Sequence, residues 1–181
     1  MTSIIKVNEI QDAGGNTILS SNGTSTFTSN LPDNTPAWLA NSNSVQTFSL
    51  SSTTKINFTT EIFDTDNAYD TTTSKFTVPS GKAGKYFVSG QMAIQNSANY
   101  NEVQFVLYKN GAEITNMQTR MRLTSDYFNA TSAQRLHVAG IIDLAEADYL
   151  EFYVYLNSAS GGTPQSNSGQ TSFRGYKLIG A

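Results

Sequence analysis

Cysteine is absent from all 181 residues of this sequence, and charged residues make up only 14% of them. Without cysteine, disulfide bridges and thiolate metal sites are excluded. The net charge is −3, and no stretch gathers lysine and arginine into a basic stripe. We therefore expect no nucleic-acid binding, because phosphates would meet no cationic surface.

Long apolar runs are also missing. No segment approaches the roughly 20 apolar residues of a membrane span, so we expect no membrane insertion. The N-terminus, Met1-Thr-Ser-Ile-Ile-Lys, lacks the apolar stretch of a signal peptide. We expect a soluble protein that is made in a cytoplasm and is not exported by a standard secretory signal.

Residues for catalysis are scarce. His137 is the single histidine and lies between Leu136 and Val138 in an expected strand, which favours a structural or surface role. Nucleophilic catalysis needs a base that a third group holds, and the sequence alone places none beside it. Glu146 and Asp148 could be the paired carboxylates of a glycoside hydrolase, but charged residues at such a turn are usually solvated. We predict no enzymatic activity and no cofactor.

One acidic segment has the oxygen ligands that calcium would need, namely Asp64-Thr-Asp66-Asn-Ala-Tyr-Asp70. It lacks the downstream glycine and glutamate of an EF-hand loop. Turns capped by aspartate side chains account for the same residues. We predict no metal site and keep calcium binding as the less favoured alternative.

The residues that are plentiful favour an all-β domain, because β-branched and aromatic side chains are common and charge is low. Lys109-Asn110-Gly111 indicates a tight hairpin turn, since Asn-Gly accepts positive φ at both central positions. The expected strands are Val45–Leu50, Lys55–Thr59, Tyr86–Ile94, Val103–Tyr108, Ile114–Leu123, Leu136–Leu144, Leu150–Leu156 and Phe173–Ile179.

Aromatic residues exceed what one sandwich of this size needs inside. The surplus comprises Tyr100, Tyr108, Tyr127, Phe128, Tyr153, Tyr155, Phe173 and Tyr176. Tyr153 and Tyr155 alternate with apolar residues along one strand, on a face too aromatic for ordinary exposure. Buried contacts between identical subunits favour such side chains. A sugar-binding platform of exposed aromatics is the competing interpretation.

The first 40 residues differ from the rest and are expected to form an extended arm and linker, followed by one domain over 41–181. Ile4–Ile10 and Thr17–Ser20 flank a turn at 12–16 and predict a hairpin. A lone hairpin is marginally stable in water, so this one needs a surface to lie on. The candidate attachment residues are Ile4, Ile5, Val7, Ile10, Ile18 and Leu19.

From Phe58 to Val88, aromatic residues recur across turn-rich spacers. Six positions match one signature in register: Phe58, Asp64, Tyr69, Phe76, Gly84 and Tyr86. Their spacing resembles that of the C1q-like branch of the TNF-like jelly rolls. Three features depart from it: the gap between Phe76 and Gly84 is two residues longer, Val88 replaces an aromatic, and Gly90 stands where Phe or Tyr is usual.

Two later blocks carry the same resemblance. Asp143–Phe152 is similar to the family's Leu-x-x-Gly-Asp-x-Val turn, with Ala147 in place of the glycine, and Thr171–Leu178 is similar to its closing strand. The resemblance covers roughly residues 45–180. It implies an all-β, C1q/TNF-like jelly-roll β-sandwich that forms a homotrimer through the sheet containing the closing strand.

On that resemblance, the candidate residues of the trimer interface are Phe173, Tyr176, Tyr153 and Tyr155, with the first two near the three-fold axis. The arm has its own resemblance. Ser3–Ile10 followed by Asp12–Thr17 is similar to N-terminal segments of virion proteins from tailed phages of marine bacteria and cyanobacteria.

Together these resemblances imply a non-enzymatic virion structural protein of a tailed bacteriophage. Its partners would be two further copies of itself and other virion proteins of the capsid or tail. The capsid surface is the preferred site, as a decoration or head-fibre protein. The alternative is a short tail-fibre module that recognises a host-surface glycan or protein. We expect localisation in the virion after synthesis in the bacterial cytoplasm.

Overall fold

The computed structural model describes residues 7–21, 23, 27–29, 33–95, 100–122, 134–158, 164–166 and 168–179. Strands, turns and bends make up the regular structure of these residues, and no helix occurs among them. The all-β prediction is confirmed. The chain divides into two compact units, residues 1–33 and residues 34–179.

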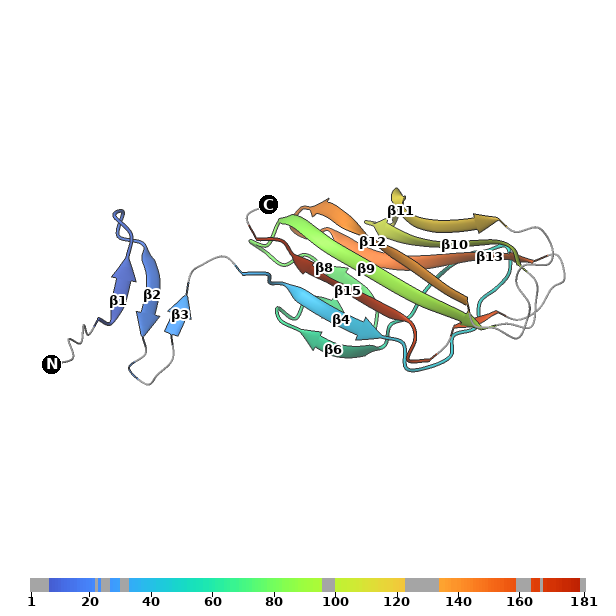
Figure 1. The fold of residues 1–181 in the computed structure, drawn as a ribbon, viewed down its shortest axis with the longest axis horizontal. Coiled ribbons are helices and arrows are strands. Elements are labelled where there is room, and N and C mark those ends of the chain that lie inside the picture. The colour runs from blue at the N-terminus through green and yellow to red at the C-terminus, as the bar shows by residue number, and fades with distance from the viewer. Residues whose placement is uncertain are drawn as a thin grey trace. The chain divides into compact units, whose positions relative to one another are not determined.

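The larger unit is a sandwich of two six-stranded antiparallel sheets (Figure 1). Sheet I has the order β12 (Gln134–Leu144), β9 (Gly84–Gln95), β15 (Ser172–Lys177), β4 (Ala37–Asn41) and β6 (Thr60–Asp64), with β14 (Gln165–Ser166) also paired to β9. Sheet II has the order β11 (Ala112–Arg122), β10 (Tyr100–Lys109), β13 (Tyr149–Ser158), β8 (Lys75–Thr77) and β7 (Tyr69–Asp70), with β5 (Thr53–Lys55) paired to β13.

The core between the sheets is built from aromatic rings. Trp38 of β4 stacks on Phe76 of β8 with ring centroids 3.6 Å apart. Phe173 of β15 meets the edges of Trp38 and Phe152 at centroid distances of 5.5 and 5.1 Å. Phe58 packs against Phe152 and Phe173. The aromatic positions of the signature therefore mark residues that both sheets send into one core.

Two glycines in sheet I allow these rings to approach the backbone. A Cβ atom at Gly90 would lie 2.4 Å from the ring of Phe152, and one at Gly175 would lie 2.3 Å from the indole of Trp38. Both distances are far below van der Waals contact, so a side chain at either position would displace the ring. The departure from the signature at Gly90 thus has a physical cause: Phe152 already fills the space of the usual aromatic.

The turns follow the expected chemistry. Asn110 and Gly111 have φ of 52° and 78°, which confirms the tight turn between β10 and β11. Asp64 accepts hydrogen bonds from the backbone N–H groups of Asp66 (3.2 Å) and Tyr69 (2.6 Å), so its carboxylate caps a turn as predicted. Ala147, which stands in place of the glycine of the resembling family, has a φ of 65°, a left-handed conformation that glycine adopts more readily than alanine.

Several strand boundaries differ from the predicted ones. The segment Val45–Leu50 forms no strand and makes only the isolated bridge between Thr47 and Gln165. Trp38 lies in β4 and is completely buried, so the strand that contains it belongs to sheet I. The two units therefore separate between Asp33 and Asn34, rather than at the expected boundary near residue 40. The prolines and polar residues around β4 concealed this short strand.

The smaller unit is a three-stranded antiparallel sheet of β1 (Glu9–Gln11), β2 (Thr17–Ser21) and β3 (Phe27–Ser29). The predicted hairpin is present as β1 and β2, and the third strand was not predicted. Asp12 fixes its turn by accepting hydrogen bonds from the backbone N–H groups of Gly14 and Asn16. Ile4 and Ile5 lie outside the described residues.

Candidate functional site

The outward face of sheet I carries a row of exposed apolar side chains. Tyr176 of β15 pairs with Phe87 of β9, and their ring centroids are 5.4 Å apart. Phe87 also pairs with Ile141 of β12, whose side chain is 61% exposed. These residues alternate with inward-facing ones along each strand, so they point to solvent and not to the core.

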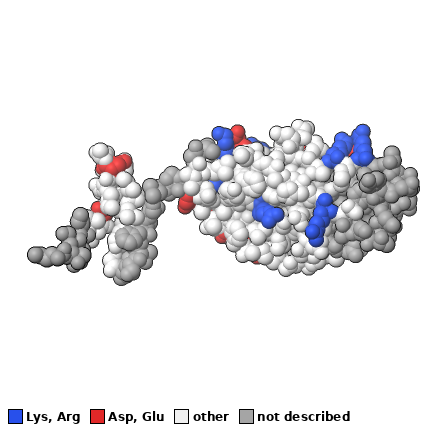
Figure 2. All heavy atoms as spheres, viewed as in Figure 1, with Lys and Arg blue, Asp and Glu red and all other residues white. Residues whose placement is uncertain are grey.

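Further apolar side chains lie on β4 and β6, where Leu39 is opposite Arg174 of β15. Leu39 pairs with Phe63, which lies on the edge strand β6 and is 47% exposed. A groove of about 300 Å³ opens here, lined by Leu39, Phe63, Phe87 and Tyr176 among others. We call Leu39, Phe63, Phe87, Ile141 and Tyr176 the apolar face. In the view of Figure 2, uncharged atoms cover most of the surface over β4, β9 and β15, interrupted by a few Lys or Arg side chains.

The outward face of sheet II has a different composition. Tyr153 and Tyr155 of β13 lie opposite Val106 and Gln104 of β10. The ring centroids of Tyr108 and Tyr153 are 4.2 Å apart. Burial raises the pKa of both hydroxyls, with Glu113 adding to the rise for Tyr108 and Glu151 for Tyr153. All three tyrosines are half-buried. We call Tyr108, Tyr153 and Tyr155, with the polar side chains beside them, the tyrosine face.

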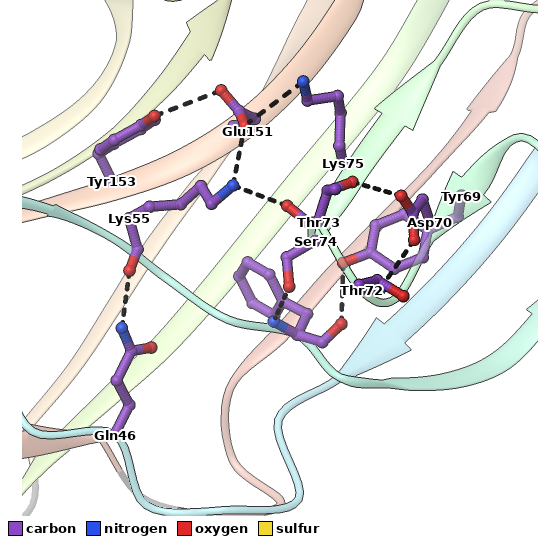
Figure 3. Close-up of polar contacts among 11 residues, drawn as sticks. Gln46, Lys55, Tyr69, Asp70, Thr72, Thr73, Ser74, Lys75, Glu151 and Tyr153 are labelled. Carbon is purple, nitrogen blue, oxygen red and sulfur yellow. Dashed lines mark hydrogen bonds and ion pairs between the residues drawn. The ribbon is translucent and has the colours of Figure 1, made fainter.

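Glu151 is a buried carboxylate at the margin of the tyrosine face (Figure 3). Its Oε1 atom lies 3.1 Å from Nζ of Lys55 and 4.0 Å from Nζ of Lys75. The hydroxyl of Tyr153 donates to its other oxygen at 3.3 Å. Two lysines and one hydroxyl thus provide partners for a side chain that is only 5% exposed, as the burial of a polar group requires.

The surrounding contacts in Figure 3 connect three segments of the chain. Lys55 also donates to the backbone oxygen of Thr73 at 2.7 Å. The hydroxyl of Ser74 accepts from the N–H of Phe58 at 2.9 Å, and the Tyr69 hydroxyl donates to the oxygen of Phe58 at 3.0 Å. Burial raises the pKa of Tyr69 far above its usual range. This cluster fixes the segments around residues 55–58 and 69–75 against β13, which is a structural role.

Comparison with solved structures supports one fold. The chain aligns with the globular domain of a zebrafish complement 1qA protein over 80% of its length and 98% of that chain, with 11% identity and a TM-score of 0.55. It aligns with Eiger TNF from S. frugiperda over 82% and 96%, with 13% identity and a TM-score of 0.56. Murine APRIL aligns over 78% and 98%, with 12% identity and a TM-score of 0.54.

The protein has the C1q/TNF-like jelly-roll fold. No protein-family profile matches the chain. Among curated proteins, it is similar to the phage-like element PBSX protein XkdV of Bacillus subtilis (strain 168), with 27% identity over 104 residues. The match spans 56% of this chain and 15% of the length of that relative, so the two share only a segment.

The jelly roll separates the four predicted interface residues. Tyr176 lies on the apolar face of sheet I, whereas Tyr153 and Tyr155 lie on the outer side of sheet II. Phe173 is completely buried inside the subunit between Trp38 and Phe152, so its prediction as an interface residue is wrong. The prediction failed because the closing strand alternates, and Phe173 and Tyr176 have opposite parity within it.

Sequence reasoning missed most of the apolar face. Leu39, Phe63, Phe87 and Ile141 were not among the predicted interface residues. The signal for two of them was available: Phe87 directly follows the core residue Tyr86, and Ile141 is out of phase with Leu136 and Val138, which are buried. Alternation along a strand would have placed both on the outer side of their sheet.

The residues considered for catalysis have other roles in the jelly roll. Nε2 of His137 lies 3.0 Å from the hydroxyl of Ser89, and no carboxylate of the described residues pairs with that ring. Glu146 accepts a hydrogen bond from the N–H of Gly81 at 3.1 Å. Asp148 pairs with Lys109 at 2.6 Å and accepts from the N–H of Ala145 at 2.7 Å, so it caps its turn.

The part of the chain that the structure describes shows neither a metal-binding cluster nor a helix that could span a membrane. Its residues contain no group of three or more His, Cys, Asp or Glu side chains that could hold a metal ion. The carboxylate of Asp70 is engaged by the N–H of Thr72 and the hydroxyl of Thr73. None of the elements found there is a helix with the length and apolar character that a membrane crossing requires.

Proposed function

We propose that this protein is a non-enzymatic structural component of a phage particle, a trimeric jelly-roll knob that its N-terminal unit anchors. The apolar face of sheet I carries the proposal. Phe63, Ile141 and Tyr176 are 47, 61 and 39% exposed in the single chain. Contiguous apolar surface of this kind marks an interaction site. The similarity to a protein of a phage-like element supports the proposal that the knob belongs to a phage particle.

The arrangement of the apolar face favours a closed ring of copies. Phe63 lies on β6 and Ile141 on β12, which are the two outermost strands of the sheet path. A contact that joins one edge of a copy to the opposite edge of the next is heterologous, and such contacts close into rings. In a ring of three copies, Phe63, Ile141 and Tyr176 of each copy would be buried. The resemblance to C1q-like and TNF-like jelly rolls implies the same number and the same sheet.

Light scattering of the purified full-length chain tests the trimer. We expect three times the chain mass of 19.6 kDa, independent of concentration over the micromolar range. A monodisperse monomer under the same conditions would contradict the proposal. A dimer would retain the apolar face as an interface but reject the trimer.

The N-terminal unit is the proposed anchor, because its sheet cannot bury its own apolar residues. Val7 and Ile10 are 53 and 46% exposed, Ile18 is 36% exposed, and Leu19 is half-buried. Together with Ile4 and Ile5 they form the candidate attachment residues. Three short strands without a core gain stability by packing on a partner surface.

Removal of residues 1–33 tests the anchor. We expect a soluble trimer of the remaining jelly roll that no longer joins particles when it complements a deletion. Incorporation of the truncated protein at wild-type occupancy would place the anchor elsewhere. A second test keeps the chain at full length: the double variant Ile10→Ser with Ile18→Ser should also lower occupancy while the trimer remains intact.

We propose the capsid surface as the location. Only residues 30–36 connect β3 to β4, and even a fully extended chain of this length spans at most about 30 Å. A fibre that reaches a distant receptor needs a longer shaft. A knob close above its anchor suits a head decoration, where three arms spread over neighbouring capsid subunits. Immunogold labelling of intact particles should place gold on the head, and gold confined to the tail would reject this location.

One observation favours a second location, the tail. The match to the phage-like element protein covers 15% of that relative's length, so a similar segment occurs within a much longer chain. A longer tail protein could supply the shaft and carry this trimer as a short receptor-binding tip. Labelling at the tail tip would support this second candidate.

A further inference from the structure

The tyrosine face is unlike the apolar face in one decisive respect. Among the described residues, every large hydrophobic side chain that is strongly exposed belongs to the N-terminal unit, sheet I, the segment before β5 or the C-terminal end. None lies on the outward face of sheet II. Val106 points outward there but is only 1% exposed, because Tyr153 and its neighbours cover it. The described residues of this face therefore offer a partner no strongly exposed aliphatic side chain.

The tyrosine rings are the accessible apolar surface of this face. Tyr108 and Tyr153 support each other across β10 and β13 at a centroid distance of 4.2 Å. Tyr155 lies two residues further along β13 on the same side. Each hydroxyl provides a polar end to an apolar ring, and strand geometry fixes the rings in advance of binding. Rings held in this way present flat carbon surfaces at low entropic cost on binding.

Hydrogen-bonding side chains frame the rings and hold one another in place. Gln104 donates to Glu113 at 3.0 Å and to Gln118 at 2.8 Å. Glu102 pairs with Arg120 and Arg122, and these partners hold its pKa below the usual range although desolvation opposes the shift. Planar amides and ion-paired groups with unused donor and acceptor positions therefore lie next to the tyrosines.

Charge on this face is nearly balanced. The cations Lys55, Lys75, Arg120 and Arg122 stand against the carboxylates Glu102, Glu113 and Glu151. A polyanion would gain little from such a mixed surface, since the carboxylates already engage the cations. The complementary ligand is neutral, has flat apolar faces and carries many hydroxyls that both donate and accept.

We propose that the tyrosine face binds a neutral saccharide chain. Sugar rings would stack on Tyr155 and on the Tyr108–Tyr153 pair, while their hydroxyls bond to Gln104 and the neighbouring polar groups. The site lies on the sheet opposite the apolar face, so the proposal goes beyond the structural role and does not depend on the trimer. It gives the particle a surface that adheres to neutral glycans.

Affinity electrophoresis of the full-length protein tests the proposal. The gels contain one neutral polysaccharide each: dextran, hydroxyethyl cellulose, galactomannan or xylan. A parallel gel contains heparin as the polyanion. We expect retardation in at least one neutral gel and none in heparin at physiological salt. Migration unchanged in every neutral gel would overturn the proposal, and so would retardation by heparin alone.

Two variants at one position connect binding to the site. Tyr155→Ala should weaken the apparent association with the retarding polysaccharide at least tenfold, whereas Tyr155→Phe should change it less than threefold because the stacking ring remains. Gln104→Ala should weaken it several-fold. Tyr176→Phe on the apolar face serves as the control and should leave binding unchanged. Equal binding by wild type and Tyr155→Ala, both folded by circular dichroism, would also overturn the assignment.

Discussion

The two outer faces of the sandwich cover one core but differ in their surface chemistry. On sheet I, the side chains of Phe87 and Ile141 point outward next to each other, and Arg174 is among the residues that line the adjoining groove. On sheet II, tyrosine rings alternate with amides and ion pairs that already satisfy one another. Both faces arise from the same two-residue period. Burial in a subunit contact would stabilise the apolar face most, whereas the tyrosine face can remain exposed to water and bind a ligand.

The same substitution on each face gives the largest expected contrast. Tyr176→Asp places a carboxylate within the apolar face and should weaken self-association about 100-fold or more, because the charge loses its hydration in the interface. Tyr155→Asp on the tyrosine face should leave the oligomer intact. Sedimentation velocity of both variants at equal concentration measures the difference. Identical oligomers for the two variants would remove the distinction between the faces.

A second test concerns the ion pairs at the margin of the tyrosine face. Glu151→Ala leaves Lys55 and Lys75 facing each other without their carboxylate. We expect a loss of about 1–3 kcal/mol in the free energy of unfolding, moderated because both lysine side chains are 30% exposed. Urea denaturation gives the value. Arg174→Ala on sheet I is the control and should change stability by less than about 0.5 kcal/mol.

The pH dependence of sheet II provides a third test. Burial alone would raise the pKa of Asp148, but hydrogen bonds from Lys109, Asn110 and the N–H of Ala145 lower it to about 2. Since the pKa is lower in the folded than in the unfolded state, its stabilisation is complete above pH ~4 and is lost as pH falls towards 2. After a discount for solvent screening at this surface turn, the contribution is on the order of 1 kcal/mol.

Comparison with Asp148→Asn isolates this effect from that of the other carboxylates. The stability difference between wild type and variant, measured by urea unfolding, should shrink steadily from pH 5 to pH 2. A difference that stays constant over this range would show that the charge of Asp148 does not contribute.

The smallest expected effect concerns the turn that leads into β13. Ala147 has a φ of 65°, which costs an alanine roughly 1–2 kcal/mol relative to glycine. Ala147→Gly should raise the free energy of unfolding by about 0.5–1 kcal/mol after the larger entropy of the unfolded glycine is included. Asn67→Gly is the matched control, because its φ of 54° is one that asparagine tolerates, and its gain should be smaller. Calorimetry measures both.

Sequence reasoning predicted local features well because their causes are local. The Asn110-Gly111 turn and the capping role of Asp64 follow from residue chemistry within a few positions. The jelly-roll fold was expected from a family resemblance, and the aromatic residues of the six-position signature that carries this resemblance all enter the core. β4 was missed because a five-residue strand with one tryptophan has little pattern of its own.

The assignment of surfaces failed for a non-local reason. Tyr176 and Tyr153 are both outward tyrosines, and nothing near either residue tells which sheet its strand will join. Pairing between β15 and β4 connects residues more than 130 positions apart, and only this topology separates the two faces. Parity within the closing strand was a local signal, and its use would have assigned Phe173 to the core.

The glycines beneath the core rings have a consequence for the divergence of this protein. Gly90 and Gly175 can accept no side chain, because Phe152 and Trp38 occupy the space of a Cβ atom. Their neighbours in the same strands, Ser89 and Tyr176, point outward and are not bound by that constraint. Substitutions at the outward positions, which alternate with the inward ones, can therefore change the apolar face while the strands keep their packing. A lineage could change its assembly partner and retain the same core.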